Sequence, residues 1–153
     1  MNAIELLKAD HEVVAGLFAE VEKTSEDKHP AIFKKIKAEL DAHVHIEEKL
    51  FYPKLKADGR KELVDIVLEG IEEHHQVKMF LRELELLADD SAKFEPKLTI
   101  LIEDVEHHVE EEEKEMFPLV KKQFDEAVLD ELGAEMKKEK AAFKKSNAAA
   151  AGK

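Results

Sequence analysis

The chain has 153 residues, of which 39% are charged and 44% hydrophobic, with a formal net charge of −12 and no cysteine. An acidic chain repels nucleic acids and anionic membranes, and the lack of cysteine excludes disulfides, thiolate metal sites and cysteine redox chemistry. The length fits one domain, and the small number of glycines (five) and prolines (four) favours long helices over a sheet.

The first half of the chain predicts two long helices. The N-terminus, MNAIELLKADHE, carries acidic residues and lacks an uninterrupted apolar run. We therefore expect no secretory signal and no membrane span, and we expect the protein to be cytoplasmic. The first helix is predicted from Asn2, a suitable N-cap, to about residue 23. The second begins at Pro30 and continues to about Lys56, with Gly59 as its C-terminal stop.

The second half of the chain predicts two further long helices and a weaker one. The third helix is predicted over residues 61–87, and the fourth opens at Pro96 and ends near Phe124. A weaker helical pattern and the tail SNAAAAGK follow. We therefore expect an all-α fold, with an antiparallel four-helix bundle in residues 1–124, an accessory C-terminal helix in 125–147 and a disordered tail in 148–153.

An internal repeat relates the two halves. The segments AHVHIEEKLFYP (42–53) and HHVEEEEKEMFP (107–118) align without a gap. The matched positions are His43 with His108, Glu47 with Glu112, Glu48 with Glu113, and Pro53 with Pro118. The first and third helices match more loosely through His11 and His74. The chain is therefore interpreted as two helix pairs with an approximate twofold relationship.

Four histidines and two glutamates occupy positions that a helix bundle normally fills with aliphatic residues. Bundle helices bury positions that are alternately three and four residues apart. On that spacing the core-facing polar residues are His11, His43, Glu47, His74, His108 and Glu112. The same spacing turns His45, His75 and His107 outward, and His29 lies in a predicted loop. The neighbouring acidic residues Glu48, Glu110, Glu111 and Glu113 are expected on a solvated face, and the alternative is that one of them supports a metal ligand from outside.

These six core-facing residues predict a metal site. A single buried histidine is usually a packing residue, but unpaired buried carboxylates are unfavourable, and antiparallel packing can bring all six to one level. A pair of metal ions would neutralise them, and imidazole with carboxylate favours iron, manganese or zinc over calcium or magnesium. The symmetric assignment places His11 and His43 on one ion, His74 and His108 on the other, and Glu47 and Glu112 across both.

The ordered motifs resemble the haemerythrin-like HHE cation-binding domain over about residues 3–122. The motifs are His11, His43-x-x-x-Glu47-Glu48 before Pro53, Glu73-His74, and His108-x-x-x-Glu112-Glu113 before Pro118. The resemblance implies two non-haem iron ions (Fe2+/Fe3+) with a bridging oxo, hydroxo or water ligand. It also implies a small ligand, namely O2, peroxide or NO, and roles in oxygen or redox sensing, iron handling, or oxidative and nitrosative stress. An enzyme of this kind would act as a peroxidase or catalase, or would reduce NO or O2.

Two positions depart from the oxygen-carrying haemerythrins. Lys78 stands where those proteins have a second histidine four residues beyond His74, and Glu112 stands where they have aspartate. Fewer histidines leave more open coordination positions. This difference favours redox or peroxide chemistry over reversible oxygen carriage.

Two other functions remain open from the sequence. An iron-storage bundle of the ferritin type requires Glu-x-x-His on each of two helices, and the chain offers only Glu72-x-x-His75. A metal-free interaction bundle would use the core-facing histidines as a pH switch. We expect a monomer or weak homo-oligomer that binds neither nucleic acid nor membrane.

Overall fold

Every regular element in residues 1–151, the part of the chain that the structure describes, is a helix. The elements of this computed structural model are α1 (Ala3–Lys23), the 3₁₀ turn η1 (Glu26–Lys28), α2 (His29–Ile46), the π-helical η2 (Glu47–Phe51), α3 (Tyr52–Asp58), α4 (Lys61–Leu86), α5 (Phe94–Glu111), the π-helical η3 (Glu112–Met116), α6 (Phe117–Gln123) and α7 (Glu126–Ala151). None of the helices in these residues combines the length and the apolar composition that a membrane span requires.

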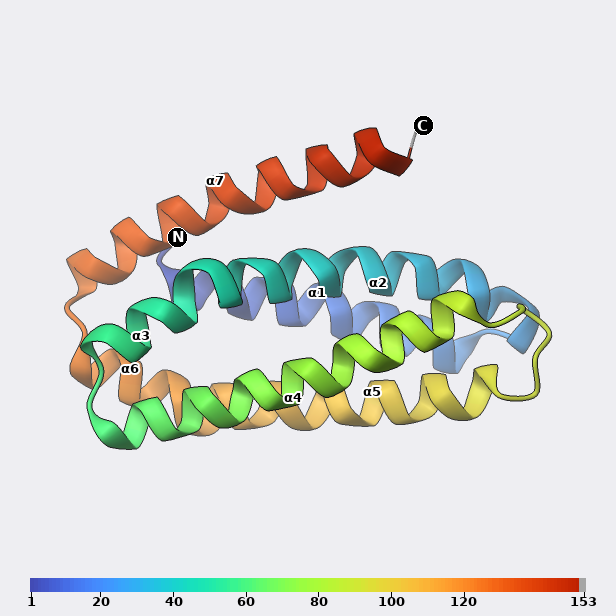
Figure 1. Cartoon of the computed structure of the whole chain (residues 1–153), viewed down its shortest axis with the longest axis horizontal. Coiled ribbons are helices and arrows are strands. Elements are labelled where there is room, and N and C mark those ends of the chain that lie inside the picture. The colour runs from blue at the N-terminus through green and yellow to red at the C-terminus, as the bar shows by residue number, and fades with distance from the viewer. Residues whose placement is uncertain (152–153) are drawn as a thin grey trace.

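These elements form four long rods and one outer helix (Figure 1). The first rod is α1, the second joins α2, η2 and α3, the third is α4, and the fourth joins α5, η3 and α6. α1 packs against α2 and α4 against α5, so the bundle consists of two helix pairs, as the internal repeat predicts. The predicted all-α bundle with an additional C-terminal helix is confirmed.

Local signals in the sequence set the helix ends. Asn2 caps α1, because its side chain accepts a hydrogen bond from the backbone N–H of Glu5 at 2.9 Å and Glu5 accepts one from Asn2 in return. Gly59 follows the last residue of the second rod, as predicted. α2 begins at His29, so Pro30 occupies its first turn one residue later than expected. The N–H that proline lacks is not needed there, because N–H groups in a first turn have no partner within the helix.

α7 lies outside the bundle and packs across α1 and α2 (Figure 1). It continues as a helix to Ala151, beyond the predicted end at residue 147, because its terminal alanines have the highest helix propensity. Residues 152 and 153 of the expected tail lie outside the described residues. The division of the chain into a bundle domain and an accessory segment stays a prediction.

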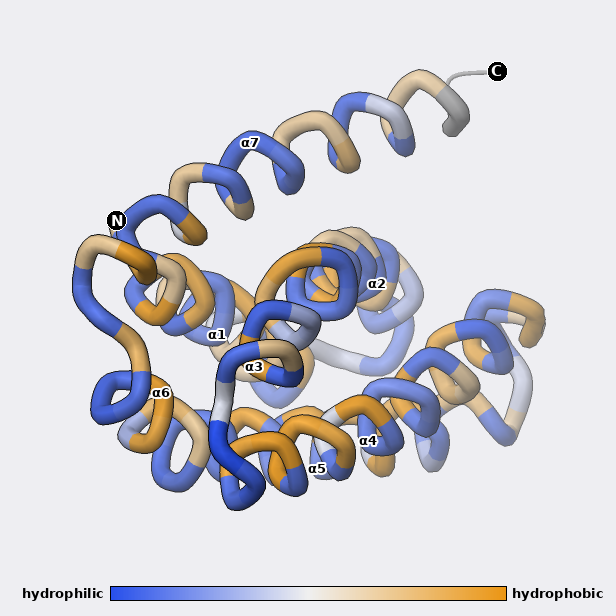
Figure 2. The backbone as a smooth tube through the Cα atoms, turned by 60° about the vertical axis from the view of Figure 1, so that its left-hand side comes forward, coloured by the Kyte–Doolittle hydropathy of each residue, from blue (hydrophilic) through white to orange (hydrophobic). Residues whose placement is uncertain are grey.

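The apolar core of the bundle consists of two clusters along its length. Apolar residues recur along each rod (Figure 2). One cluster lies toward α3 and α6 and also receives side chains from α7, among them Met136. The other lies toward the opposite end of the rods. In α1 the boundary falls between Leu7 of the first cluster and Val14 of the second, on either side of His11. A polar layer therefore separates the two clusters.

Candidate metal centre

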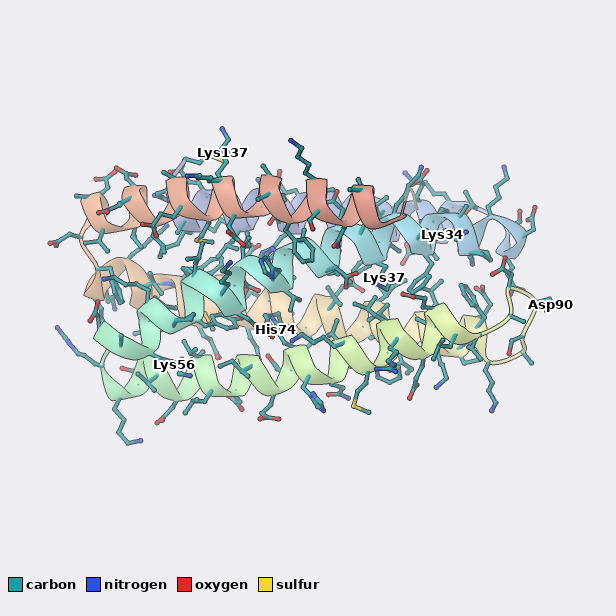
Figure 3. All side chains as sticks on the ribbon, turned by 45° about the horizontal axis from the view of Figure 1, so that its top comes forward. Lys34, Lys37, Lys56, His74, Asp90 and Lys137 are labelled. Carbon is teal, nitrogen blue, oxygen red and sulfur yellow. The ribbon has the colours of Figure 1, made fainter. Side chains whose placement is uncertain are left out.

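The polar layer contains all six of the core-facing residues that the sequence predicts. Each rod contributes one histidine, and the second and fourth rods each add a glutamate. The buried residues of the layer include His11, His43, Glu47, His74, His108 and Glu112. Glu47 and Glu112 are 0% and 1% exposed. Figure 3 marks His74 at mid-length of the bundle, where it projects between the rods.

The four histidines form two pairs. The ring centroids of His11 and His43 are 5.0 Å apart, and those of His74 and His108 are 4.8 Å apart. The histidines are thus paired as the sequence analysis pairs them, and the assignment of each pair to one ion stays a prediction. One pair joins the first and second rods, and the other pair joins the third and fourth.

Each glutamate lies between a histidine of one pair and a histidine of the other. Oε1 of Glu47 is 3.1 Å from Nε2 of His43 and 3.1 Å from Nε2 of His74. The carboxylate oxygens of Glu112 lie 3.2 Å and 3.3 Å from Nε2 of the other two histidines. Each carboxylate therefore faces both histidine pairs.

A π-helical turn begins at each glutamate. η2 starts at Glu47 and η3 at Glu112, whereas the sequence predicts uninterrupted α-helices there. Pro53 and Pro118 follow these turns, and a proline inside a helix lacks an N–H and crowds the carbonyl four residues before it. The wider π turn relieves this crowding and shifts the phase of the rod, and such turns often occur at functional sites. The two prolines were the available signal in the sequence.

Four outer carboxylates support the histidines from behind. They bond to Nδ1 of each ring, in the pairs Asp10 with His43 (2.9 Å), Glu48 with His74 (2.9 Å), Glu73 with His108 (2.7 Å) and Glu113 with His11 (2.6 Å). The bonds follow one direction around the bundle, from α1 to α2, from η2 to α4, from α4 to α5 and from η3 to α1. Every histidine of the layer is thus held by the helix next to its own.

These outer carboxylates lie next to core-facing residues in the sequence. Successive residues of a helix point in directions about 100° apart. A residue next to a core-facing one therefore points toward the neighbouring helix and not toward the centre of the bundle. The sequence pattern predicts a solvated face for Glu48 and Glu113. Both keep part of that exposure, at 29% and 37% of the side chain, but each carboxylate bonds to a buried histidine. Only the packing of the helices reveals this role.

The atoms that face the centre fit a metal ion. With the proton on Nδ1, the Nε2 atom of each ring presents a lone pair to the centre, which is the arrangement of metal-binding histidines. Within residues 1–151, no hydrogen-bond partner is present for Nε2 of His11, Nε2 of His43, both oxygens of Glu47 or Oε1 of Glu112. Buried polar atoms are rarely left without a partner. A cation at the centre would satisfy all of them.

The electrostatics of the layer also favour positive charge at its centre. Burial alone lowers the pKa of His43, but the charge of Glu47 and the bond to Asp10 raise it to about 10. Burial likewise lowers the pKa of His108, whereas Glu112 raises it well above its ordinary value. The same carboxylates that stabilise protons on the histidines would stabilise a metal ion at the centre. Binding of a metal ion would therefore displace these protons.

Tyr52, the single tyrosine of the chain, lies beside the His74–His108 pair. Its hydroxyl donates a hydrogen bond to Oε2 of Glu112 at 2.5 Å and lies 3.3 Å and 3.4 Å from Nε2 of the two histidines. Burial, together with the charge of Glu112, raises the pKa of Tyr52 well above its ordinary value. The internal repeat matches Tyr52 with Phe117, and this difference between the halves was the signal that sequence analysis missed.

A small apolar cavity adjoins the histidines. Its volume is about 20 Å³, and its lining combines the four histidines with aliphatic side chains that include Val14, Val44, Val77 and Val105. This space suits about one molecule the size of water. In the described part of the chain, Tyr52 and the two glutamates lie off this lining. The layer therefore has an apolar side and a side that holds a hydroxyl proton.

The model of the haemerythrin HHE cation-binding domain matches residues 2–120. The chain belongs to this family. The resemblance predicted over about residues 3–122 is thereby confirmed, and with it a haemerythrin-like protein whose buried histidines and glutamates can bind metal.

Relatives of this HHE protein occur in mycobacteria. It is 32% identical over 140 residues to the uncharacterized protein Rv2633c of Mycobacterium tuberculosis, which covers 89% of the chain and 83% of the relative, and the same values hold for the uncharacterized protein Mb2666c of Mycobacterium bovis. The crystal structure of an HHE-domain protein from Mycobacterium kansasii, described as an Rv2633c homolog, superimposes with a TM-score of 0.80 at 31% identity and covers 95% of this chain and 89% of that one. This share is larger than the four-helix bundle alone, so the similarity extends into α7.

The remaining histidines of the HHE protein lie outside the layer, as their spacing predicts. His45 stacks against Phe143 of α7, and His75 and His107 are exposed. His29, predicted in a loop, instead begins α2 and is buried. The adjacent residues His74 and His75 are therefore separated by the fold into one buried and one exposed side chain.

Proposed function

We propose that this HHE protein is a non-haem di-iron protein that binds or reacts with O2, peroxide or NO. The observation that carries the proposal is the set of inward-facing nitrogen and oxygen atoms that have no hydrogen-bond partner within residues 1–151. Imidazole with carboxylate suits iron, manganese and zinc, and the resemblance to haemerythrins favours iron. A cytoplasmic location and a monomeric or weakly associated state belong to the same proposal and stay predictions.

The proposed ligands are the six core-facing residues. His11 and His43 would hold one ion, His74 and His108 the other, and Glu47 and Glu112 both. The short separations within each histidine pair support this assignment, as does the position of each glutamate between the pairs. For ions that take about six ligands each, this set leaves positions for water and a small ligand.

Iron, when bound, supplies a redox-active centre with an open position for a small ligand. The residues of the chain shape the space beside it, since the adjoining cavity of about 20 Å³, lined by valines and the four histidines, suits a small ligand. Tyr52 holds a proton 2.5 Å from a carboxylate oxygen of Glu112. A proton held at this place favours reactions that move protons, such as the disproportionation of hydrogen peroxide to O2 and water, over reversible carriage of O2.

Metal analysis together with visible absorption tests the proposal. The protein reconstituted with Fe2+ and then oxidised should contain about two iron ions per chain, with one at each histidine pair, and show visible bands that change on addition of azide or peroxide. His74→Ala should lose iron and the bands, whereas His75→Ala, one residue further along and exposed, should keep both. Wild-type protein without bound iron or bands would refute a di-iron centre.

Peroxide assays distinguish reaction from binding. Iron-loaded protein should release O2 from hydrogen peroxide, and zinc-loaded protein should not, because zinc has no redox chemistry. Changes in the spectrum with azide or NO but no release of O2 would limit the function to ligand binding.

A further inference from the structure

Asp10 is the least exposed of the four outer carboxylates and lies beneath α7. Its side chain is 7% exposed, whereas the other three range from 26% to 37%. Lys140 of α7 bonds to Oδ1 of Asp10, and Oδ2 accepts a hydrogen bond from Nδ1 of His43 at 2.9 Å. One carboxylate thus connects a helix outside the bundle to a core-facing histidine.

Specific contacts on both sides of Lys140 fix α7 on the bundle. The His45 ring stacks on Phe143 with centroids 4.3 Å apart and an angle of 20°. Glu139 accepts a hydrogen bond from Lys49 at 2.8 Å and lies 3.0 Å from Nε2 of His45. Toward its N-terminus α7 passes so close to the start of the chain that a Cβ atom on Gly133 would lie 2.6 Å from backbone atoms there. These contacts hold the backbone at Lys140 in a defined place.

α7 also makes the two halves of the polar layer different. Asp10 precedes the histidine of the first helix, and Glu73 precedes the matched histidine of the third helix. α7 follows the second half of the repeat in sequence but packs on α1 and α2, which form the first half (Figure 1). The His11–His43 side therefore receives a lysine from outside the bundle, while the other pair has Tyr52 beside it.

We propose that Lys140 is a positioning residue of the polar layer, which through Asp10 holds the His43 ring with its Nε2 atom directed at the centre. A carboxylate bonded to lysine through one oxygen and to histidine through the other has a fixed orientation. Without the lysine, the buried Oδ1 lacks a partner, and the carboxylate regains solvation by turning toward water. That rotation breaks the bond to Nδ1 and frees the His43 ring. Outer partners of metal-binding histidines normally prevent such movement of the ring.

Proton NMR of the metal-free, full-length protein tests the positioning independently of metal. The Nδ1–H of His43 should give a downfield resonance that exchanges slowly with water and disappears in His43→Gln. In Lys140→Met this proton should exchange at least about tenfold faster, because its hydrogen bond opens more often. Lys140→Arg should restore slow exchange. The matched control is Lys144→Met, since Lys144 lies one turn further along α7 and bonds to Glu39 of α2 at 2.9 Å. An unchanged exchange rate in Lys140→Met would overturn the proposal, as would equal acceleration in Lys144→Met.

Loss of metal to a chelator gives the second readout, which rests on the proposed function. Lys140→Met should lose one of the two ions about tenfold faster than wild type. This factor is the lower end of the loss in metal affinity that follows removal of the partners of metal ligands. Lys140→Arg and Lys144→Met should follow wild type, and equal rates in Lys140→Met and wild type would contradict the proposal. A wild type that takes up no metal would refute the proposed function alone, because the exchange measurement would still decide the role of Lys140.

Discussion

The hydroxyl of Tyr52 donates a hydrogen bond to Oε2 of Glu112 across 2.5 Å, within a layer where both side chains are 1% exposed. The bond holds Glu112 in place and keeps a proton beside the His74–His108 pair. At the matched position of the other half, Phe117 stacks against His11 and supplies no hydroxyl. The fold therefore accepts either ring, and the hydroxyl is the feature that distinguishes the two sides.

Tyr52→Phe should leave the fold unchanged and, at equal iron content, slow the release of O2 from peroxide by about a hundredfold, the lower end of the usual effect of removing a group that transfers protons. The test is the initial rate of O2 release at equal iron content, compared with wild type. The circular dichroism spectrum and the iron analysis serve as controls. A rate equal to that of wild type would show that Tyr52 moves no proton in the reaction.

Glu48→Ala should weaken iron binding by roughly 10- to 100-fold, because Glu48 accepts the hydrogen bond that orients His74. Competition with a chelator of known affinity measures the change. Glu110→Ala is the control, since Glu110 is exposed and accepts a hydrogen bond from Lys114, one turn further along, at 2.6 Å. Equal affinities in the two variants would contradict a role of the outer carboxylates in binding.

The spacing of apolar residues predicted the bundle and the polar layer because both depend on periodicity within single helices. The same spacing separated His74 from His75, which lie about 100° apart around one helix. It could not identify Asp10 or Glu113 as partners of histidines, because each of them acts on a different helix. Which side of the bundle α7 covers is likewise set by contacts between distant segments, such as that of Lys140 with Asp10.

The π turns and Tyr52 show a second limit of the sequence. Each of Pro53 and Pro118 interrupts a helical pattern, and a proline there indicates a kink, an end or a wider turn. Tyr52 stands in a run of apolar residues and fits a core position equally well as a packing residue. Its role became visible only from the atoms around its hydroxyl.

Two glycine substitutions should have opposite effects on stability. Gly133→Ala should lower the free energy of unfolding by about 1–3 kcal/mol, because the new Cβ would meet backbone atoms of Met1 and Asn2 at 2.6 Å and displace α7. Gly16→Ala should raise it by about 1 kcal/mol, since alanine favours a helix and nothing lies within 4 Å of the added atom. Urea unfolding of the metal-free proteins measures both. Equal stabilisation by the two substitutions would show that α7 does not pack closely on the N-terminus.

His29 should make stability depend on pH. Its Nδ1 lies 2.7 Å from Oε1 of Glu95 and its Nε2 2.8 Å from the carbonyl oxygen of Val21, so the protonated ring donates to both. Burial lowers the pKa of His29, but Glu95 and the backbone carbonyls raise it above its ordinary value of 6.5 overall. Because the pKa of His29 is raised in the folded state, the protonated ring contributes fully to the free energy of unfolding below about pH 6.5. This contribution disappears as the pH rises through the folded-state pKa.

The difference in unfolding free energy between wild type and His29→Gln isolates this contribution, because both proteins share the other titrating groups. We expect about 1 kcal/mol in favour of wild type below pH 6.5, a modest value because Glu95 is 33% exposed, and a smaller difference at higher pH. Urea unfolding at a series of pH values measures the trend. His75→Gln, at an exposed position, is the control for replacing a histidine by glutamine. A constant difference between wild type and His29→Gln would show that the ring contributes equally in both protonation states.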